Sequence, residues 1–265
     1  MTLTEKNYYS PESNRKYMSV SQYKQFDKCE AAAMAQLNGE WGPPKSTALL
    51  VGSYVDAWFE GTLDMFMSEH PELFKKDGSL KADFVQAAEL IDRVQRDPLF
   101  MEYMAGSKQV IRTAVLFGTR WKIKIDSLHP DKIVDLKVMR SVERIMGRSF
   151  VEYWGYDLQM AIYSEVEYLA NRKKKKVPKD TYLAVVTKQT PADLEIIEIP
   201  EWRRKELLQE VERKMPHILE VKAGKLAPTR CGICEYCRAT KKLTEPIDFE
   251  LVGLSAFERK AIFGT

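Results

Sequence analysis

The sequence predicts an α/β fold in which a small mixed sheet is flanked by helices. Three observations support this class: helical periodicity over the first hundred residues, a β-rich stretch in the middle of the chain, and helical periodicity again after it. The first β-rich runs follow one another directly, which excludes a regular alternating βαβ repeat. With 265 residues, of which 45% are hydrophobic, the chain can bury a sizeable core.

Helices are predicted where apolar residues recur three or four positions apart between capping and breaking residues. Ser19 or Ser21 caps the first helix, Gly61 ends the second, and Pro98 follows the third. The predicted helices cover residues 19–37, 46–61, 81–97, 151–170 and 201–223.

Strands are predicted in runs rich in β-branched and aromatic residues. A turn at Gly118 and Thr119 makes a hairpin of the first two runs, and a turn around Pro130 precedes the third. The run at 182–186 is continuously apolar, which is typical of a central strand. The predicted strands cover residues 110–117, 120–125, 132–136, 182–186 and 194–199.

The domain organisation follows from composition. Residues 1–17 are polar and predict a flexible N-terminus, whereas residues 18–265 predict a single domain with a cysteine-containing C-terminal segment at 228–240. The N-terminus lacks the apolar core of a signal peptide, and no run of about eighteen apolar residues occurs, so we expect a cytoplasmic protein without membrane spans. A net charge of +3 neither demands nor excludes nucleic acid.

Candidate catalytic residues lie in KIDSLHPDKIVDLK, residues 124–137. Asp126 ends one predicted strand, and Asp135 and Lys137 share a face of the next strand while Leu136 points away. Two adjacent carboxylates favour a cation between them, and Mg²⁺ prefers oxygen ligands. An ammonium group beside a metal-bound water can orient that water and stabilise charge on a phosphate. A D-x-K tripeptide alone is more often a solvated face, so its order and context carry the prediction of phosphodiester hydrolysis.

This region resembles the PD-(D/E)xK nuclease superfamily, whose restriction-endonuclease-like core carries such a set on adjacent strands. GSYVDAWFEG (52–61) places Asp56 on a helix and resembles the G-x-x-acid motif of RecB-type and RecE-type nucleases, where some relatives carry His. YDLQMAIYSE (156–165) gives Gln159 and Tyr163 on one helical face and resembles their Q-x-x-x-Y motif. In isolation these residues would indicate a surface acid and an ordinary amphipathic face.

The resemblance implies roles for these residues. Gln159 and Tyr163 would hold DNA or the catalytic lysine in place. The cofactor would be Mg²⁺ or Mn²⁺, as two ions. Its implied ligands are Asp56, Asp126, Asp135 and the backbone carbonyl of Leu136.

From SQYKQFDKCEAAA to CGICEYCRATKKL, the chain resembles phage and prophage RecE-type exonucleases. This implies a processive 5′ to 3′ exonuclease that acts on linear duplex DNA ends and leaves 3′ overhangs for annealing-type recombination. It also implies a ring-shaped homo-oligomer such as a tetramer, a RecT-like single-strand annealing protein as partner, and the cytoplasm of a bacterial host. The alternatives are an iron–sulfur single-strand or flap nuclease of the CRISPR-associated type and a non-catalytic DNA-binding module. The intact acid–acid–lysine set argues against the last.

Four cysteines form a second candidate site. Cys231, Cys234 and Cys237 are spaced C-x-x-C-x-x-C, and Cys29 is alone near the N-terminus. Thiolates at this spacing converge on one metal site. The one-plus-three arrangement resembles the [4Fe–4S] site of several RecB-type nucleases, although the last gap here is shorter. Zinc and unliganded reduced thiols are the other two interpretations.

Basic residues near these motifs are candidate DNA contacts. Arg140, Arg144 and Arg148 share one face if their segment is helical, and we expect them to hold DNA near the site. The run RKKKK, residues 172–176, is either a solvated helix end or a strip that contacts phosphates.

Overall fold

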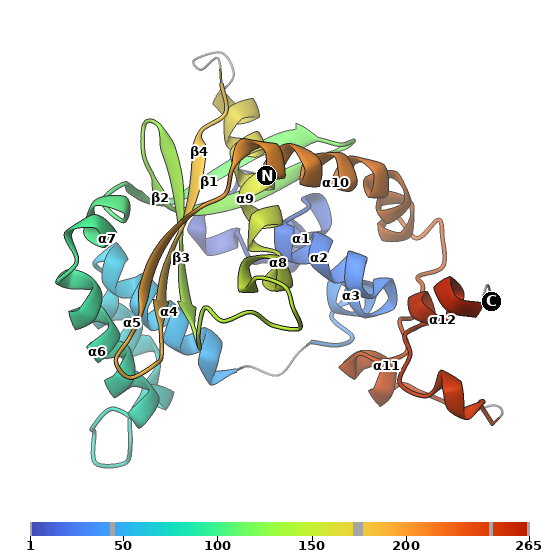
Figure 1. The fold of residues 1–265 in the computed structure, drawn as a ribbon, viewed down its shortest axis with the longest axis horizontal. Helices are drawn as coiled ribbons and strands as arrows, with labels where there is room; N and C mark the ends of the chain where they lie inside the picture. Colours follow the sequence, from blue (N-terminus) through green and yellow to red (C-terminus); the bar gives the residue numbers. More distant parts are fainter. Residues whose placement is uncertain (1, 43–45, 172–176, 244–245, 264–265) are drawn as a thin grey trace. The chain divides into compact units, whose positions relative to one another are not determined.

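The computed structural model describes residues 2–42, 46–171, 177–243 and 246–263 (Figure 1). The basic run at 172–176 lies outside the described residues. The chain divides into two compact units, and the single domain expected over 18–265 stays a prediction. The sheet unit comprises residues 44–114 and 122–209, and the terminal unit comprises residues 1–43, 115–121 and 210–265. No helix in the described part of the chain is both long and apolar enough to cross a bilayer.

A five-stranded sheet with the order β1-β2-β3-β4-β5 organises the sheet unit. β2 and β3 are antiparallel, β3 and β4 are parallel, and β4 and β5 are antiparallel, so the predicted mixed sheet is present. The strands are β1 (Ser107–Leu116), β2 (Thr119–Leu128), β3 (Lys132–Met139), β4 (Asp180–Thr187) and β5 (Leu194–Glu198). The hairpin that we predicted around Gly118 joins β1 to β2, with Phe117 and Gly118 both at positive φ. The tip of this hairpin belongs to the terminal unit.

Helices cover both faces of β3 and β4 (Figure 1). One face presents alternate apolar side chains, among them Val134, Leu136 and Ala184, to a buried core that includes Val55 and Phe84. The opposite face of β3 contacts the helix that connects β3 to β4, as a parallel crossover requires. The helices of this unit are α4 (Thr47–Glu60), α5 (Leu63–Glu69), η2 (Pro71–Leu73), α6 (Ala82–Gln95), α7 (Pro98–Tyr103), α8 (Phe150–Trp154) and α9 (Tyr156–Asn171).

The terminal unit consists mainly of helices. We expected a flexible arm at residues 1–17, but the structure has η1 and α1 there, and Tyr8, Ser13 and Tyr17 are buried. The ammonium group of Lys222 donates hydrogen bonds to the carbonyl oxygens of Asn14 and Tyr17, which ties this segment down. The helices of the terminal unit are η1 (Glu5–Asn7), α1 (Pro11–Lys16), α2 (Val20–Lys28), α3 (Glu30–Asn38), α11 (Glu235–Ala239), η3 (Phe249–Leu251) and α12 (Ala256–Phe263). The long helix α10 (Glu201–Lys222) belongs to the sheet unit up to residue 209 and to the terminal unit from residue 210.

Two predicted helices are each divided in the structure. The helix expected over 19–37 breaks at Cys29, which is extended and separates α2 from α3. The helix expected over 151–170 breaks at Gly155, whose φ of 63° ends α8 in a left-handed conformation. Both breaks lie beside candidate sites.

Candidate active site

Asp135 and Lys137 lie two residues apart on β3 and share the face that meets α9. Asp135 is 2% exposed. Its Oδ1 accepts a hydrogen bond from Gln159 Nε2 at 2.7 Å, and its Oδ2 forms an ion pair with the Lys137 ammonium. Gln159 therefore bonds the acid of the D-x-K motif directly, and both oxygens of Asp135 are oriented.

Asp126 meets β3 where the β2–β3 ladder ends. In the backbone ladder between β2 and β3, Leu128 pairs with Ile133 and Ser127 pairs with Val134. Farther along β3, the Leu136 N–H donates to Asp126 Oδ2 at 2.9 Å. A side chain thus replaces the ladder carbonyl. Because the N–H and C=O of one strand residue point to the same side, the Leu136 carbonyl is directed toward Asp126 as well.

Asp56 joins this group from α4. Its pKa is raised to about 7, chiefly by burial; the Asp135 carboxylate and Glu60 add to the rise, and Lys137 opposes it. Burial, together with Asp135 and Asp56, also raises the pKa of Asp126 well above its usual range. The structure thus brings together all the predicted acids, and without a cation Asp56 and Asp126 hold protons more tightly than isolated carboxyl groups.

Lys137 remains an ammonium in this environment. Burial alone would lower its pKa, but the Asp135 and Asp126 carboxylates outweigh burial and raise the pKa above its ordinary value. Its Nζ also lies 4.8 Å from the centroid of the Tyr156 ring. The side chain can therefore supply positive charge and hydrogen bonds, whereas it is a poor proton acceptor.

Tyr163 lies one helical turn beyond Gln159 and is half-buried. Tyr156, at the start of the same helix, contacts Lys137, although no sequence motif selects it. Its hydroxyl donates to Met139 Sδ at 3.3 Å.

Sequence reasoning also missed residues on β1. Gln109 Nε2 donates to Asp126 Oδ1 at 3.4 Å, and Gln109 has a positive φ of 50°, a conformation that a non-glycine residue rarely adopts. Beside it, the buried Nζ of Lys108 lies 5.5 Å from the Phe59 ring centroid. Burial lowers the Lys108 pKa and nearby Asp126 opposes the change. Neither residue belongs to a motif, so only the folded arrangement identifies them.

The predicted arginine face does not form. Residues 140–149 are not helical: Ile145 pairs with Arg148 across a turn in which Met146 and Gly147 both have positive φ. Arg144 donates to the Gly147 carbonyl at 2.6 and 3.2 Å. The condition for a shared helical face is therefore not met, because the turn at Met146 and Gly147 interrupts the segment. All three arginines, Arg140, Arg144 and Arg148, are nevertheless exposed.

The donor set of this site fits a hard divalent cation. Asp126, Asp135, Asp56 and the Leu136 carbonyl all offer oxygen, the ligand type that Mg²⁺ and Mn²⁺ prefer. Among the described residues, the four cysteines are the one set of three or more metal-ligating side chains whose donor atoms lie within 4.8 Å of one another. The aspartates do not form such a closed set, so a cation would also need oxygens from water or a phosphate.

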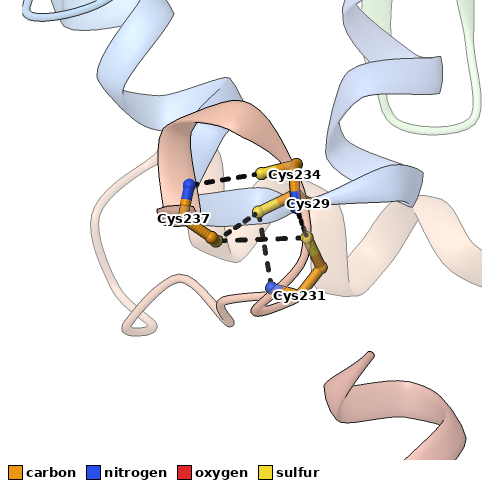
Figure 2. Close-up of side chains that lie close together, drawn as sticks. All are labelled: Cys29, Cys231, Cys234 and Cys237. Atoms are coloured by element: carbon orange, nitrogen blue, oxygen red, sulfur yellow. Dashed lines mark hydrogen bonds between the residues drawn. The ribbon is translucent and has the colours of Figure 1, made fainter. Parts of the chain in front are cut away.

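The four cysteines converge within the terminal unit (Figure 2). Cys29 comes from the break between α2 and α3, and the other three come from the loop and first turns of α11. Cys29, Cys231 and Cys237 are buried and Cys234 is half-buried. The predicted one-plus-three set is thus assembled across 202 residues of sequence.

These two sites allow the chain to be classified. A mixed sheet whose central antiparallel strands separate at an acid–acid–lysine set is characteristic of PD-(D/E)xK proteins. The chain belongs to the family described as "PDDEXK-like domain of unknown function" (DUF3799), whose model matches residues 19–240. The predicted α/β fold class and the superfamily are therefore confirmed, and the narrower RecE-type assignment stays a prediction.

Solved structures extend this comparison. A protein from Eubacterium rectale, described as a "Putative exonuclease" and solved at 2.19 Å resolution, is 48% identical to this chain with a TM-score of 0.88. The match covers 96% of this chain and 99% of that protein. The protein SSO0001 is 14% identical over 84% of this chain and 96% of its own, with a TM-score of 0.31. No curated protein matches the chain.

Proposed function

We propose that this chain is a divalent-metal-dependent deoxyribonuclease that hydrolyses phosphodiester bonds. The observation that carries this proposal is the arrangement around Asp135, which is bonded to Lys137 and Gln159 on one face of β3. On the neighbouring strand, Asp126 accepts the Leu136 N–H. The sequence motifs select the same acids, lysine and glutamine.

The acids would hold Mg²⁺ or Mn²⁺, as two ions, through Asp126, Asp135, Asp56 and the Leu136 carbonyl. A bound ion supplies Lewis acidity and lowers the pKa of its water. Lys137 places a fixed positive charge where negative charge builds on the phosphate during attack. Gln159 holds the Asp135 carboxylate in one orientation. Tyr163 lies on the same helix, and we assign to it the positioning of DNA.

Replacement of Lys137 by alanine tests this mechanism. We expect Lys137→Ala to lower Mg²⁺-dependent degradation of linear duplex DNA at least about 100-fold, the loss typical of removing one electrostatic contact to a transition state. Duplex binding in Ca²⁺ should persist, because the alanine leaves exposed basic residues in place. The measurements are release of acid-soluble nucleotides and a binding titration.

A matched control lies on the same strand. Lys132 is on β3, five residues away, with Nζ 4.7 Å from the Tyr103 ring centroid and 4.0 Å from Asp131. Lys132→Ala should retain activity within a few-fold. Full activity in Lys137→Ala would refute the catalytic role, and equal loss in both variants would point to misfolding.

We further propose a 5′ to 3′ exonuclease that generates 3′ overhangs on linear duplex DNA. Two observations support this: the resemblance of the motifs to RecE-type exonucleases, and the similarity over 96% of this chain to a protein described as a "Putative exonuclease". With separately labelled duplexes, the 5′ label should be released first and circular duplex should resist. Early loss of the 3′ label would contradict the polarity.

The resemblance to RecE-type enzymes also gives the proposed assembly. We propose a ring-shaped homo-oligomer, such as a tetramer, in a bacterial cytoplasm, acting with a RecT-like annealing protein. Light scattering on the purified chain measures its oligomeric state, and a monomer at micromolar concentration would contradict the proposed ring. Retention of a purified annealing protein on the immobilised chain measures the second, and absence of retention would contradict it.

Single-stranded DNA in the same digestion tests a second candidate function, a single-strand or flap nuclease. A CRISPR-associated type of nuclease would degrade single strands or flaps and leave blunt duplex intact, and the cysteine set is the observation that favours it. A non-catalytic module would bind all three DNAs without cutting. The result that we expect, preferential digestion of linear duplex, excludes both.

A further inference from the structure

The four cysteines differ from the acidic site in chemistry and lie in the other unit of the chain. Sulfur is a soft donor, and four thiolates without any oxygen ligand or open position describe a structural metal site. What the sequence leaves open is whether this set holds a [4Fe–4S] cluster, a single ion or nothing. The spacing of the sulfur atoms distinguishes a cluster from a single ion.

The sulfurs lie close to one another. Cys29 Sγ is 3.6 Å from Cys237 Sγ, and Cys231 Sγ is 4.0 Å from Cys237 Sγ. All four lie within 4.8 Å of one another. Four sulfurs placed about 2.3 Å from one central zinc at tetrahedral angles would be about 3.8 Å apart. The Cys29–Cys237 and Cys231–Cys237 separations lie on either side of this value.

A [4Fe–4S] cluster does not fit the same space. Each cysteine of such a site binds a different iron, and four irons with four sulfides must lie between the ligand sulfurs. Two of the sulfur–sulfur separations are 3.6 and 4.0 Å, and every separation in the set is within 4.8 Å, so the four sulfurs enclose no such volume. The cluster implied by the resemblance to RecB-type nucleases is therefore incompatible with this geometry.

The backbone around the sulfurs is arranged for thiolates. The N–H of Cys231 points to Cys29 Sγ at 3.5 Å, that of Cys234 to Cys231 Sγ at 3.4 Å, and that of Cys237 to Cys234 Sγ at 3.4 Å (Figure 2). Three of the four sulfurs thus accept a hydrogen bond from the main chain. Such bonds favour the negatively charged sulfur that binds metal.

Side chains hold this loop in shape. Arg230 donates to the Cys237 carbonyl at 3.3 Å, and Arg238 donates to the Ile233 carbonyl at 2.8 Å. Their two positive charges also offset the charge of −2 that four thiolates around one divalent ion would carry. Glu30, which follows Cys29 in the sequence, accepts a hydrogen bond from the Thr229 N–H through Oε2 at 2.8 Å.

We propose that Cys29, Cys231, Cys234 and Cys237 form a closed tetrahedral site for one zinc ion, which fastens the helix break after α2 to the segment that contains α11. Zinc is the ion whose thiolate preference and tetrahedral geometry match four cysteines. Its role is structural, because no ligand position remains for water or substrate. This proposal does not depend on the nuclease assignment.

Metal analysis of the full chain tests the proposal directly. Protein purified without oxygen from medium that contains both iron and zinc should carry one zinc per chain, no acid-labile sulfide and no brown colour. Cobalt exchanged into the site should give the intense visible absorption of tetrahedral cobalt thiolate. Four irons with sulfide, a single iron, or no bound metal would each overturn the proposal.

Variants separate the site from general folding. Cys234→Ser, at the half-buried cysteine, should lose stoichiometric zinc and lower the melting temperature. Ile233→Ala is the matched control: it is in the same loop, its side chain is 43% exposed, and its backbone carbonyl bond to Arg238 is retained. The control should keep one zinc. Equal zinc content in Cys234→Ser and wild type would also overturn the proposal, whatever the nuclease assay shows.

Discussion

Asp135 is the residue around which the acidic site is built. One oxygen accepts a bond from Gln159 and the other is paired with Lys137, so the carboxylate cannot rotate without losing a contact. Because Asp135 is only 2% exposed, water cannot replace a lost contact, and losing one would destabilise the carboxylate. A fixed carboxylate is what a cation with strict ligand geometry requires.

Removing the Gln159 amide should therefore affect catalysis more than DNA binding. A hydrogen bond to a charged group contributes roughly 1.5–3 kcal/mol, which corresponds to about 10- to 100-fold in rate if the bond is needed in the transition state. We expect Gln159→Leu to lower kcat within this range. A suitable control is Gln86→Leu, since Gln86 lies on α6 and its Nε2 donates to the carbonyl of Lys188, which follows β4. Equal kcat values for wild type and Gln159→Leu would contradict the positioning role.

The raised pKa of Asp56 predicts how stability depends on pH without metal. Its folded value of about 7 lies above the usual value of 3.8, so the folded state holds the proton more tightly than the unfolded state. Stability is then lost as pH rises from about 4 to 7, and the full penalty applies above 7. Asp126 acts in the same direction, because its pKa is raised too.

We therefore expect Asp56→Asn to melt higher than wild type at pH 8 in EDTA. A gain of at least about 2 °C corresponds to 1 kcal/mol in a domain of this size. The difference should vanish below about pH 3, under the unfolded pKa of 3.8, because the wild-type carboxyl is then protonated in both the folded and the unfolded state. Mg²⁺ should stabilise wild type more than the variant. A wild type that is the more stable of the two at pH 8 in EDTA would contradict the inferred penalty.

The residues of the acidic site were predictable to different degrees for physical reasons. Strand alternation alone places Asp135 and Lys137 on one face, and helical spacing alone pairs Gln159 with Tyr163. Gln109 was not predictable, since its contact with Asp126 depends on a positive φ that the surrounding fold imposes. Its local sequence indicates only a strand.

At the scale of elements, the break between α8 and α9 orients the helix that carries Gln159. Gly155 ends α8 in the left-handed conformation, and α9 begins at Tyr156, which contacts Lys137. Apolar periodicity runs through both helices, so the sequence suggests one helix from 151 to 170. The pattern misleads because a single glycine changes the direction of the chain without changing the spacing of apolar residues.

Gly155→Ala should destabilise the protein by about 1–2 kcal/mol, because a Cβ disfavours the φ of 63°. Activity should fall as well if the new side chain shifts α9. Gly52→Ala offers a control with the opposite sign: Gly52 lies inside α4, and a Cβ added there would meet nothing within 4 Å. Alanine there should raise stability by up to about 1 kcal/mol. Thermal melting measures both, and a more stable Gly155→Ala would contradict the strain.

The segment after β3 gives the prediction for DNA contacts. Arg140, Arg144 and Arg148 are exposed and follow Lys137 closely, although they do not share a helical face. If they contact phosphates, changing all three to glutamate should weaken duplex binding for every sequence. The slope of log K against the logarithm of the salt concentration should decrease in magnitude by up to about 2.7, at roughly 0.9 for each phosphate contact that is lost.

These titrations need a variant that does not degrade the DNA, so Lys137→Ala is the background. Arg96→Glu serves as the control, because Arg96 is an exposed arginine at the end of α6. An unchanged salt slope in the triple variant would remove these arginines from the DNA interface. A change equal to that of the control would show only an effect of net charge.

At the scale of the whole molecule, the terminal unit is assembled from three separate parts of the sequence. Residues 1–43, the hairpin tip at 115–121 and the chain from 210 onward contribute to it. Trp121 is fully buried, donates its indole N–H to the Leu116 carbonyl at 2.9 Å and lies beside Tyr23. Sequence patterns are local, and they could not show that the two ends of the chain share one core.

The N-terminal segment illustrates the consequence. Its polar composition suggests an arm that folding does not need, and a chain that starts at Met18 would then melt like the full protein. In the structure Tyr8 and Tyr17 are each 6% exposed, and Lys222 Nζ lies 2.8 Å from the Tyr17 carbonyl. Deleting residues 1–17 removes these buried rings and leaves a half-buried ammonium group with fewer acceptors.

We therefore expect the chain that starts at Met18 to melt at least about 5 °C lower than the full protein, since each buried aromatic side chain contributes about 1.5–3 kcal/mol. Lys222→Met isolates the polar part of the effect and should lower the melting temperature by a smaller amount. Lys205→Ala is its control on α10, because Lys205 forms an exposed ion pair with Glu201 at 2.6 Å. Equal melting temperatures for the shortened and full chains would mean that the first helix adds nothing to the core, as its composition first suggested.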